Sequence, residues 1–194
     1  MSSHHFVKEG QEPALFVVDP IADDHLLSIL EWSPMIIVAG EAMSKVASWG
    51  IRVDAIVLSD GTHNASVVHD MMKYVGPADL ISSLNGPVDA VLSYLRSKNQ
   101  YALQVLLQTP EKNLSLWEQA GDFQVTLIGS RLKWSRIQDG HFGKWIPAGT
   151  SLQVIGNGLT LNRTPFDGEQ IVVDASGIVE LASPGTFWVG EEHS

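Results

Sequence analysis

The stretch Met35–Leu58, MIIVAGEAMSKVASWGIRVDAIVL, contains the pattern that decides the fold. Met35–Ala39 and Ala55–Leu58 are short, continuous apolar runs of the kind found in strands that are buried on both faces. Between them, Ala42–Trp49 reads as a short helix, and it is followed by Gly50, a residue that often follows a helix end. The stretch therefore predicts a strand, a helix and a second strand.

The same alternation continues on both sides of this unit. Apolar runs at Ala14–Asp19, Ala78–Ser82 and Ala102–Leu107 predict three further strands. Helical patterns accompany them at Ile21–Trp32, Ala65–Tyr74, Pro87–Lys98 and Leu114–Ala120. Short apolar strands that alternate with helices indicate a mostly parallel sheet with helices on both faces, which is a doubly wound α/β domain.

The pattern changes after about residue 122. Strand-like runs then follow one another without a helix between them, and glycine-containing turns separate the later ones. These runs are Phe123–Ile128, Arg131–Ile137, Thr150–Ile155, Leu159–Leu161, Gln170–Val173, Ile178–Leu181 and Thr186–Val189. We therefore expect an α/β domain over residues 1–138 and a small antiparallel β-sandwich domain over residues 139–194.

Composition excludes several classes of function. Of the 194 residues, 44% are hydrophobic, which is enough for a sizeable core, and the net charge of -10 disfavours nucleic acid and anionic membranes as partners. The absence of cysteine excludes disulfides, thiolate zinc sites and a cysteine nucleophile. No apolar run approaches the ~20 residues of a membrane span, so we expect a soluble, cytoplasmic protein.

Short catalytic motifs are missing from the chain. It contains no Gly-x-Ser-x-Gly elbow, no Gly-x-Gly-x-x-Gly loop and no Walker-type loop. His63 and His69 flank a predicted helix start close to Asp60, which would suit a metal site. Their spacing of six residues is not the i,i+4 spacing that places two ligands on one helix face, so ordinary surface histidines are the alternative.

The order of the two domains, together with three stretches of sequence, resembles thiamine pyrophosphokinase. The stretches are Met1–Leu15, Gly50–Leu58 (GIRVDAIVL) and Lys144–Ile155 (KWIPAGTSLQVI). The resemblance implies ATP-dependent transfer of a pyrophosphoryl group to thiamine, with Mg²⁺ held by carboxylates at strand ends, and a homodimer. Such carboxylates are needed because Mg²⁺ takes hard oxygen ligands and neutralises the charge on the phosphates.

The carboxylate positions of that family carry other residues in this sequence. Counted from Gly50, the first aspartate position falls on Gly40, and the next two fall on Ser59 and Gly61. A further pair, placed by the predicted helix after residue 86, falls on Leu84 and Pro87. The family's arginine-bearing loop has no counterpart here.

Two neighbouring acids are candidates to replace them. Asp60 stands at a strand end beside Ser59, and these two are the catalytic candidates, with Asp60 also the metal candidate. Glu41 and Gly40 are the candidates for nucleotide binding. Each acid has a simpler interpretation, because Asp60-Gly61 is a common turn pair and Glu41 suits the first turn of a helix.

Two hypotheses follow from the resemblance. The first is a thiamine pyrophosphokinase-like protein, with Mg²⁺, ATP and thiamine as the family's ligands, in which catalysis is weakened or lost. The alternative is a non-catalytic, dimeric ligand-binding or regulatory module on the same fold. Lys45 and Arg52 are the nearest basic residues by sequence, and Lys45 is expected to face outward. Four tryptophans could stack on a thiazolium ring or lie in the core: Trp117, Trp134, Trp145 and Trp188.

We predict a homodimer in which the short β domain buries aromatic surface against a second copy. Its aromatic residues are many for its size: Trp145, Phe166, Phe187 and Trp188. Light scattering at micromolar concentration should give twice the 21.1 kDa of one chain. A monomer under these conditions would contradict this expectation.

Overall fold

A computed structural model of the chain describes residues 12–19, 30, 35–58, 70, 72–73, 75–83 and 85–192. The chain divides into two compact units, Met1–Gln108 and Thr109–Ser194. Among the described residues, no helix is both long enough and apolar enough to span a membrane. The predicted helices at Ile21–Trp32 and Ala65–Tyr74 lie almost entirely outside the described residues.

The first unit contains a sheet of five parallel strands, in the order β4-β3-β2-β1-β5. The strands are β1 (Ala14–Val17), β2 (Ile36–Ala39), β3 (Ala55–Leu58), β4 (Asp79–Ser82) and β5 (Ala102–Leu106). All four residues of β1 and of β2 are buried, as their continuous apolar sequences predict. The predicted parallel sheet is confirmed.

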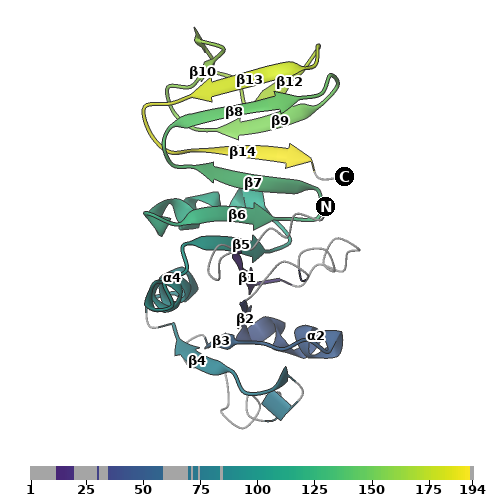
Figure 1. Cartoon of the computed structure of the whole chain (residues 1–194), viewed down its shortest axis with the longest axis vertical. Coiled ribbons are helices and arrows are strands. Elements are labelled where there is room, and N and C mark those ends of the chain that lie inside the picture. The colour runs from purple at the N-terminus through teal and green to yellow at the C-terminus, as the bar shows by residue number, and fades with distance from the viewer. Residues whose placement is uncertain are drawn as a thin grey trace, which may run out of the picture. The chain divides into compact units, whose positions relative to one another are not determined.

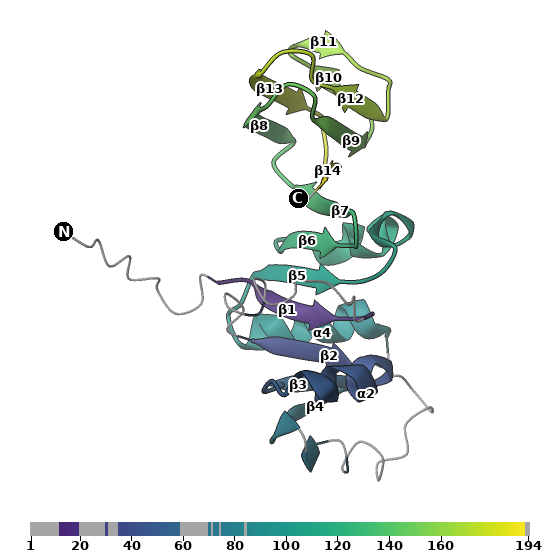
Figure 2. The same cartoon turned by 90° about the vertical axis from the view of Figure 1, so that its right-hand side faces the viewer.

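Helices cover both faces of this sheet. The segment after β2 consists of η1 (Gly40–Ala42), α2 (Met43–Val46) and η2 (Ala47–Trp49), so only four residues of the predicted helix are α-helical. Gly50 ends it in the left-handed conformation, with φ of 66°. Helix α4 (Pro87–Ser97) lies on the opposite face, as Figures 1 and 2 show together.

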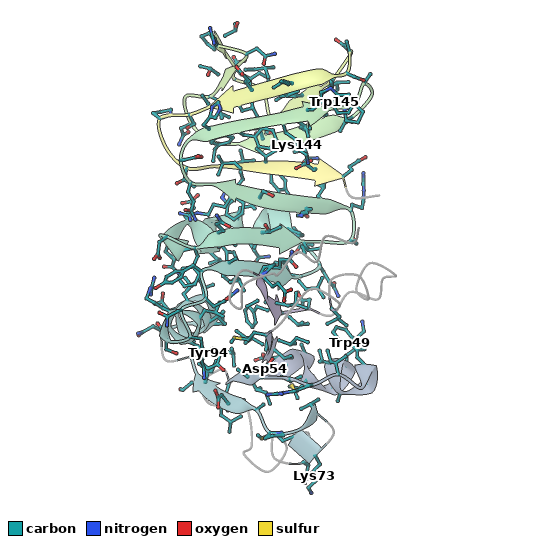
Figure 3. The ribbon with its side chains drawn as sticks, in the orientation of Figure 1. Trp49, Asp54, Lys73, Tyr94, Lys144 and Trp145 are labelled. Carbon is teal, nitrogen blue, oxygen red and sulfur yellow. The ribbon has the colours of Figure 1, made fainter. Side chains whose placement is uncertain are left out.

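A charged cluster joins α4 to the amino end of β4. The hydroxyl of Tyr94 donates to Oδ2 of Asp79 at 2.9 Å, and Lys98 Nζ lies 3.4 Å from the same oxygen. The hydrogen bonds from Tyr94 and Lys98 and the charge of Lys98 lower the pKa of Asp79. Burial, followed by the hydrogen bond to Asp79 and the charges of Asp79 and Asp54, raises the pKa of Tyr94. Figure 3 labels Tyr94 and Asp54.

The second unit is a sandwich of two antiparallel sheets. The first has the order β6-β7-β14-β9-β12 and the second the order β8-β13-β10-β11. The first comprises β6 (Gln124–Ile128), β7 (Leu132–Ile137), β14 (Phe187–Glu192), β9 (Ser151–Ile155) and β12 (Gln170–Val172). The second comprises β8 (His141–Ile146), β13 (Gly177–Ala182), β10 (Thr160–Leu161) and β11 (Thr164–Pro165). Both sheets contribute to one buried core.

Two short helical segments begin the second unit. They are η3 (Pro110–Lys112) and η4 (Leu114–Ala120), and both are 3₁₀-helices rather than the α-helix that the sequence predicts over η4. The buried residues of η4 are Leu114, Trp117 and Ala120, which are spaced by three. A period of three residues matches the 3₁₀-helix, so this winding keeps all three on one face.

The structural division falls before β6 because the strands that follow pair with each other. β7 pairs with β6 on one side and with β14 on the other, so residues 124–137 belong to the antiparallel part of the chain. The domain boundary that the sequence pattern predicts, between residues 138 and 139, stays a prediction. The structure describes the whole range Thr150–Val189 and contains no helix there, as the strand-like runs of this part of the sequence predict.

We predict that Gly190→Ala destabilises the second unit by about 1–3 kcal/mol. A Cβ at Gly190 would lie 3.0 Å from three ring atoms of Trp134. The Trp134 side chain is fully buried, so its ring can shift only by displacing atoms of a close-packed core. Urea unfolding should show the loss, with Gly143→Ala as a strand control, because a Cβ there meets its nearest atom at 3.6 Å. Equal stability of the two variants would contradict the close packing.

We also predict that Tyr94→Phe reduces the loss of stability at high pH. A tyrosine whose pKa is raised by folding stabilises the protein fully below about pH 10, and this contribution is lost as the pH rises through the folded value. Urea midpoints between about pH 8 and about pH 11 should therefore fall more steeply in the wild type than in the variant. Tyr101→Phe, at an exposed tyrosine, is the control. Identical pH curves for the wild type and Tyr94→Phe would disprove the effect.

Candidate functional site

The carboxyl edge of the parallel sheet is the place where an open α/β sheet binds ligands. The direction of strand order reverses at β1, because β2 lies on one side of it and β5 on the other. At this point the backbone N–H groups of Val18 and Asp19 both donate to the carbonyl of Leu106, at 3.0 and 3.2 Å. The exposed Asp19 therefore stands where the strand order reverses.

Sequence reasoning missed Asp19 as a site residue. The sequence did contain a signal for it, because Asp19 comes at the end of an apolar run. Asp60, which was chosen as a candidate, stands in a similar place after Ala55–Leu58. Proximity to the end of β5 could not be read from the sequence, since Leu106 is distant along the chain. The backbone hydrogen bonds add Asp19 to the candidates at this edge.

Gly40 and Glu41 lie at the carboxyl end of β2, next to β1 in the sheet. Gly40 is buried and begins η1, whereas Glu41 is exposed in its first turn. A carboxylate in a first helical turn is favourable for the structure itself, so this placement agrees with the simpler interpretation of Glu41. Gly40 has no side-chain atom that could bind a metal ion.

The remaining sequence candidates are divided between described and undescribed residues. Ser59, Asp60 and Gly61 follow β3, and they lie outside the described residues, as does Leu84. Pro87 is exposed and is the first residue of α4, where its missing N–H costs nothing. Its side chain offers no ligand atom.

The described side chains at this edge do not fit a magnesium site. In the parallel sheet, Asp19 and Glu41 are the described acids that lie within two residues of a strand's carboxyl end. Within the part of the chain that the structure describes, no group of three or more histidines, aspartates or glutamates could hold a metal ion. His63 and His69 fall outside that part of the chain, so their suggested metal role is not tested.

The nearby basic residues do not compensate for phosphate charge at this edge. Arg52 lies 3.3 Å from Asp54 and precedes β3, at the amino edge of the sheet. Lys45 is exposed, as expected for a side chain on the outer face of its helix, while Ala42 and Val46 are buried. Among the described residues, the carboxyl edge of the sheet therefore has little positive charge to offer an anionic ligand.

The structure distinguishes the four tryptophans named as possible stacking groups. Trp134 is fully buried, and Trp117 and Trp188 are each 2% exposed, so these three belong to the core. Trp145 is 61% exposed on β8, where Figure 3 labels it. Of these four, Trp145 alone presents its ring to a ligand or partner.

The set of aromatic residues proposed for a dimer interface also needs correction. Phe187 and Trp188 are buried within their own unit, because β14 lies between β7 and β9 and both its faces are covered. Phe166 is partly buried and packs against the sandwich core. Trp145 is therefore the strongly exposed member of that set.

The comparisons with known proteins concern the fold. No protein-family model and no curated protein matches the chain. A protein from Lactobacillus plantarum has a similar structure, with a TM-score of 0.66 and 12% identity, covering 94% of this chain and 99% of that one.

Two solved thiamine pyrophosphokinases are also similar in structure. The one from Geobacillus thermodenitrificans has a TM-score of 0.65 at 11% identity and covers 93% of this chain and 98% of its own. The one from Candida albicans has a TM-score of 0.64 at 9% identity, with 95% and 90% covered. At these identities the likeness shows a shared fold: the chain has the fold of thiamine pyrophosphokinases.

Proposed function

We propose that the chain is a thiamine pyrophosphokinase-like protein in which pyrophosphoryl transfer is weakened or lost. The shared fold supports the first part of the proposal, because solved thiamine pyrophosphokinases match more than nine-tenths of the chain. A fold does not establish an activity, so the second part depends on the residues at the strand ends.

Gly40 is the observation that carries the proposal. It occupies the carboxyl end of β2, where the resemblance implies an aspartate, and it is buried at the start of η1. A one-residue shift to Glu41 leads to an exposed first-turn position. Loss of one charged ligand from a phosphoryl-transfer site typically reduces the rate by orders of magnitude. Pro87 stands at a second position where the resemblance implies a carboxylate, and its side chain has no oxygen atom to bind a metal ion.

Mg²⁺ and ATP are part of the proposal only as ligands of the family. Of the described residues, Asp19 and Glu41 could contribute oxygen atoms at the carboxyl edge, and Asp60 is the further candidate by sequence. Thiamine is a cation, and both the net charge of -10 and the exposed ring of Trp145 favour a cationic ligand over an anionic one.

The alternative is a non-catalytic, dimeric ligand-binding or regulatory module. Gly40 supports this alternative equally, and ligand binding separates the two proposals. A thermal-shift series with thiamine, thiamine diphosphate and ATP would show which ligand stabilises the folded state, because any ligand specific for that state raises the unfolding temperature. A rise of the unfolding temperature with thiamine diphosphate, and with neither thiamine nor ATP, favours the regulatory module.

We predict that the purified protein releases no AMP from ATP and thiamine above background in the presence of Mg²⁺. The reason is that the described residues at the carboxyl edge include few carboxylates and little positive charge. A coupled assay for AMP measures this directly. Asp60→Ala tests the candidate ligand, and Asp174→Ala, at an exposed aspartate of the second unit, is the matched control.

The outcome that would refute the inactive form of the proposal is specific. Robust turnover by the wild type and by Asp174→Ala, together with its loss in Asp60→Ala, would make Asp60 the replacement for the missing ligands. Turnover that survives in both variants would refute the proposal as well, and would assign catalysis to other residues.

A further inference from the structure

The loop between β9 and β10 contains an asparagine that is followed directly by a glycine. Asn157 and Gly158 lie between the two strands, and both are exposed. The same pair of residues occurs a second time in the chain, as Asn85-Gly86, directly before α4. By sequence both pairs are turn signals, but the structure places them in different surroundings.

An asparagine and the backbone nitrogen of the next residue can react within the chain, because they are held close together. The nitrogen loses its proton and attacks the side-chain carbon Cγ, a C–N bond forms, and the side-chain NH₂ group leaves with a proton as ammonia. Water then opens the cyclic imide at either of its carbonyl carbons, which gives aspartate or isoaspartate. The sum is asparagine plus water to an acid plus ammonia. Glycine favours the attack because it has no Cβ that would hinder its nitrogen.

Both reacting groups are free in the loop between β9 and β10. None of the described residues accepts a hydrogen bond from the N–H of Gly158. The side-chain amide of Asn157 is also without a hydrogen bond to the described part of the chain. The nitrogen of Gly158 and Cγ of Asn157 can therefore approach each other without first breaking a contact.

The corresponding nitrogen is held in the second pair. The N–H of Gly86 donates to the carbonyl of Ser83 at 3.0 Å, and Ser83 is buried. The carbonyl of Gly86 accepts from the N–H of Ala90 at 3.2 Å, so α4 holds this peptide as well. Because the nitrogen must give up its proton before it attacks, reaction at Asn85 requires the local structure to open first.

Ser183 activates the peptide bond between Asn157 and Gly158. Its hydroxyl donates to the carbonyl oxygen of Asn157 at 2.9 Å. When the N–H of Gly158 ionises, this oxygen carries part of the negative charge, and a hydrogen bond to the charged form favours ionisation. No donor among the described residues contacts the carbonyl of Asn85.

We propose that Asn157 is a site of spontaneous deamidation, and that the fold protects Asn85 from the same reaction. Conversion of Asn157 to an acid makes the net charge of -10 one unit more negative. Asn157 lines a cavity of about 540 Å³ whose wall also contains the exposed acids Asp167 and Glu169 and no basic residue. The reaction therefore adds negative charge to this wall and increases its preference for cations over anions.

Peptide mapping by mass spectrometry tests the proposal on the full chain. The purified protein is kept at mildly alkaline pH, and the acid formed at each asparagine is followed over time in buffer and in denaturing urea. The ratio of the rates in urea measures the effect of the neighbouring residues, because the unfolded chain keeps neither arrangement. After division by that ratio, Asn157 should convert about fivefold faster than Asn85, as the ~1 kcal/mol net contribution of one backbone hydrogen bond implies.

Asn157→Gln provides the second test, because glutamine must form a larger ring and reacts much more slowly. The acidic form that anion-exchange chromatography separates should almost disappear in this variant and persist in Asn85→Gln, the matched control at another exposed asparagine.

Two results would overturn the proposal. The first is equal corrected rates at Asn157 and Asn85, or a faster reaction at Asn85. The second is conversion of Asn157 to aspartate without any isoaspartate, which an isoaspartyl-specific methyltransferase detects. Direct hydrolysis by water would then replace the attack by Gly158.

Discussion

The pairing of β14 with both β7 and β9 is the constraint on which the second unit depends. It joins the last described strand to a strand about fifty residues earlier in the chain and buries both faces of β14. Phe187 enters the sandwich core, while Trp188 packs on the opposite face. Gly190 completes the arrangement, because its missing side chain leaves room for the indole of Trp134.

The first unit has a different organisation, in which function depends on the residues that end the strands. The parallel sheet brings Asp19 and Glu41 to one edge, beside the point where the strand order reverses. The same edge in an enzyme of this fold would need several carboxylates and cations. Because a shared fold does not establish an activity, the chemistry of this edge depends on the residues of this chain and not on its likeness to thiamine pyrophosphokinases.

The two units also differ in how their polar groups are satisfied. In the first, the tyrosine hydroxyl of Tyr94 and the ammonium of Lys98 share the carboxylate of Asp79. In the second, the buried N–H groups of Trp134 Nε1, Trp188 Nε1 and Arg136 Nε find no acceptor among the described residues. The cluster in the first unit stabilises the fold because its polar and charged groups satisfy one another.

The sequence by itself determined the strands of the parallel sheet and the end of the helical segment at Gly50, because apolar runs and a glycine at a helix end act locally. It also located Gly40 and Glu41 at a strand end. Only the tertiary structure decided which strands are central, and therefore that Trp188 is buried while Trp145 is exposed. Strand β8 escaped prediction since Gly143 and Lys144 interrupt its apolar pattern. Both outcomes depend on pairing between distant segments, which leaves no local signal in the sequence.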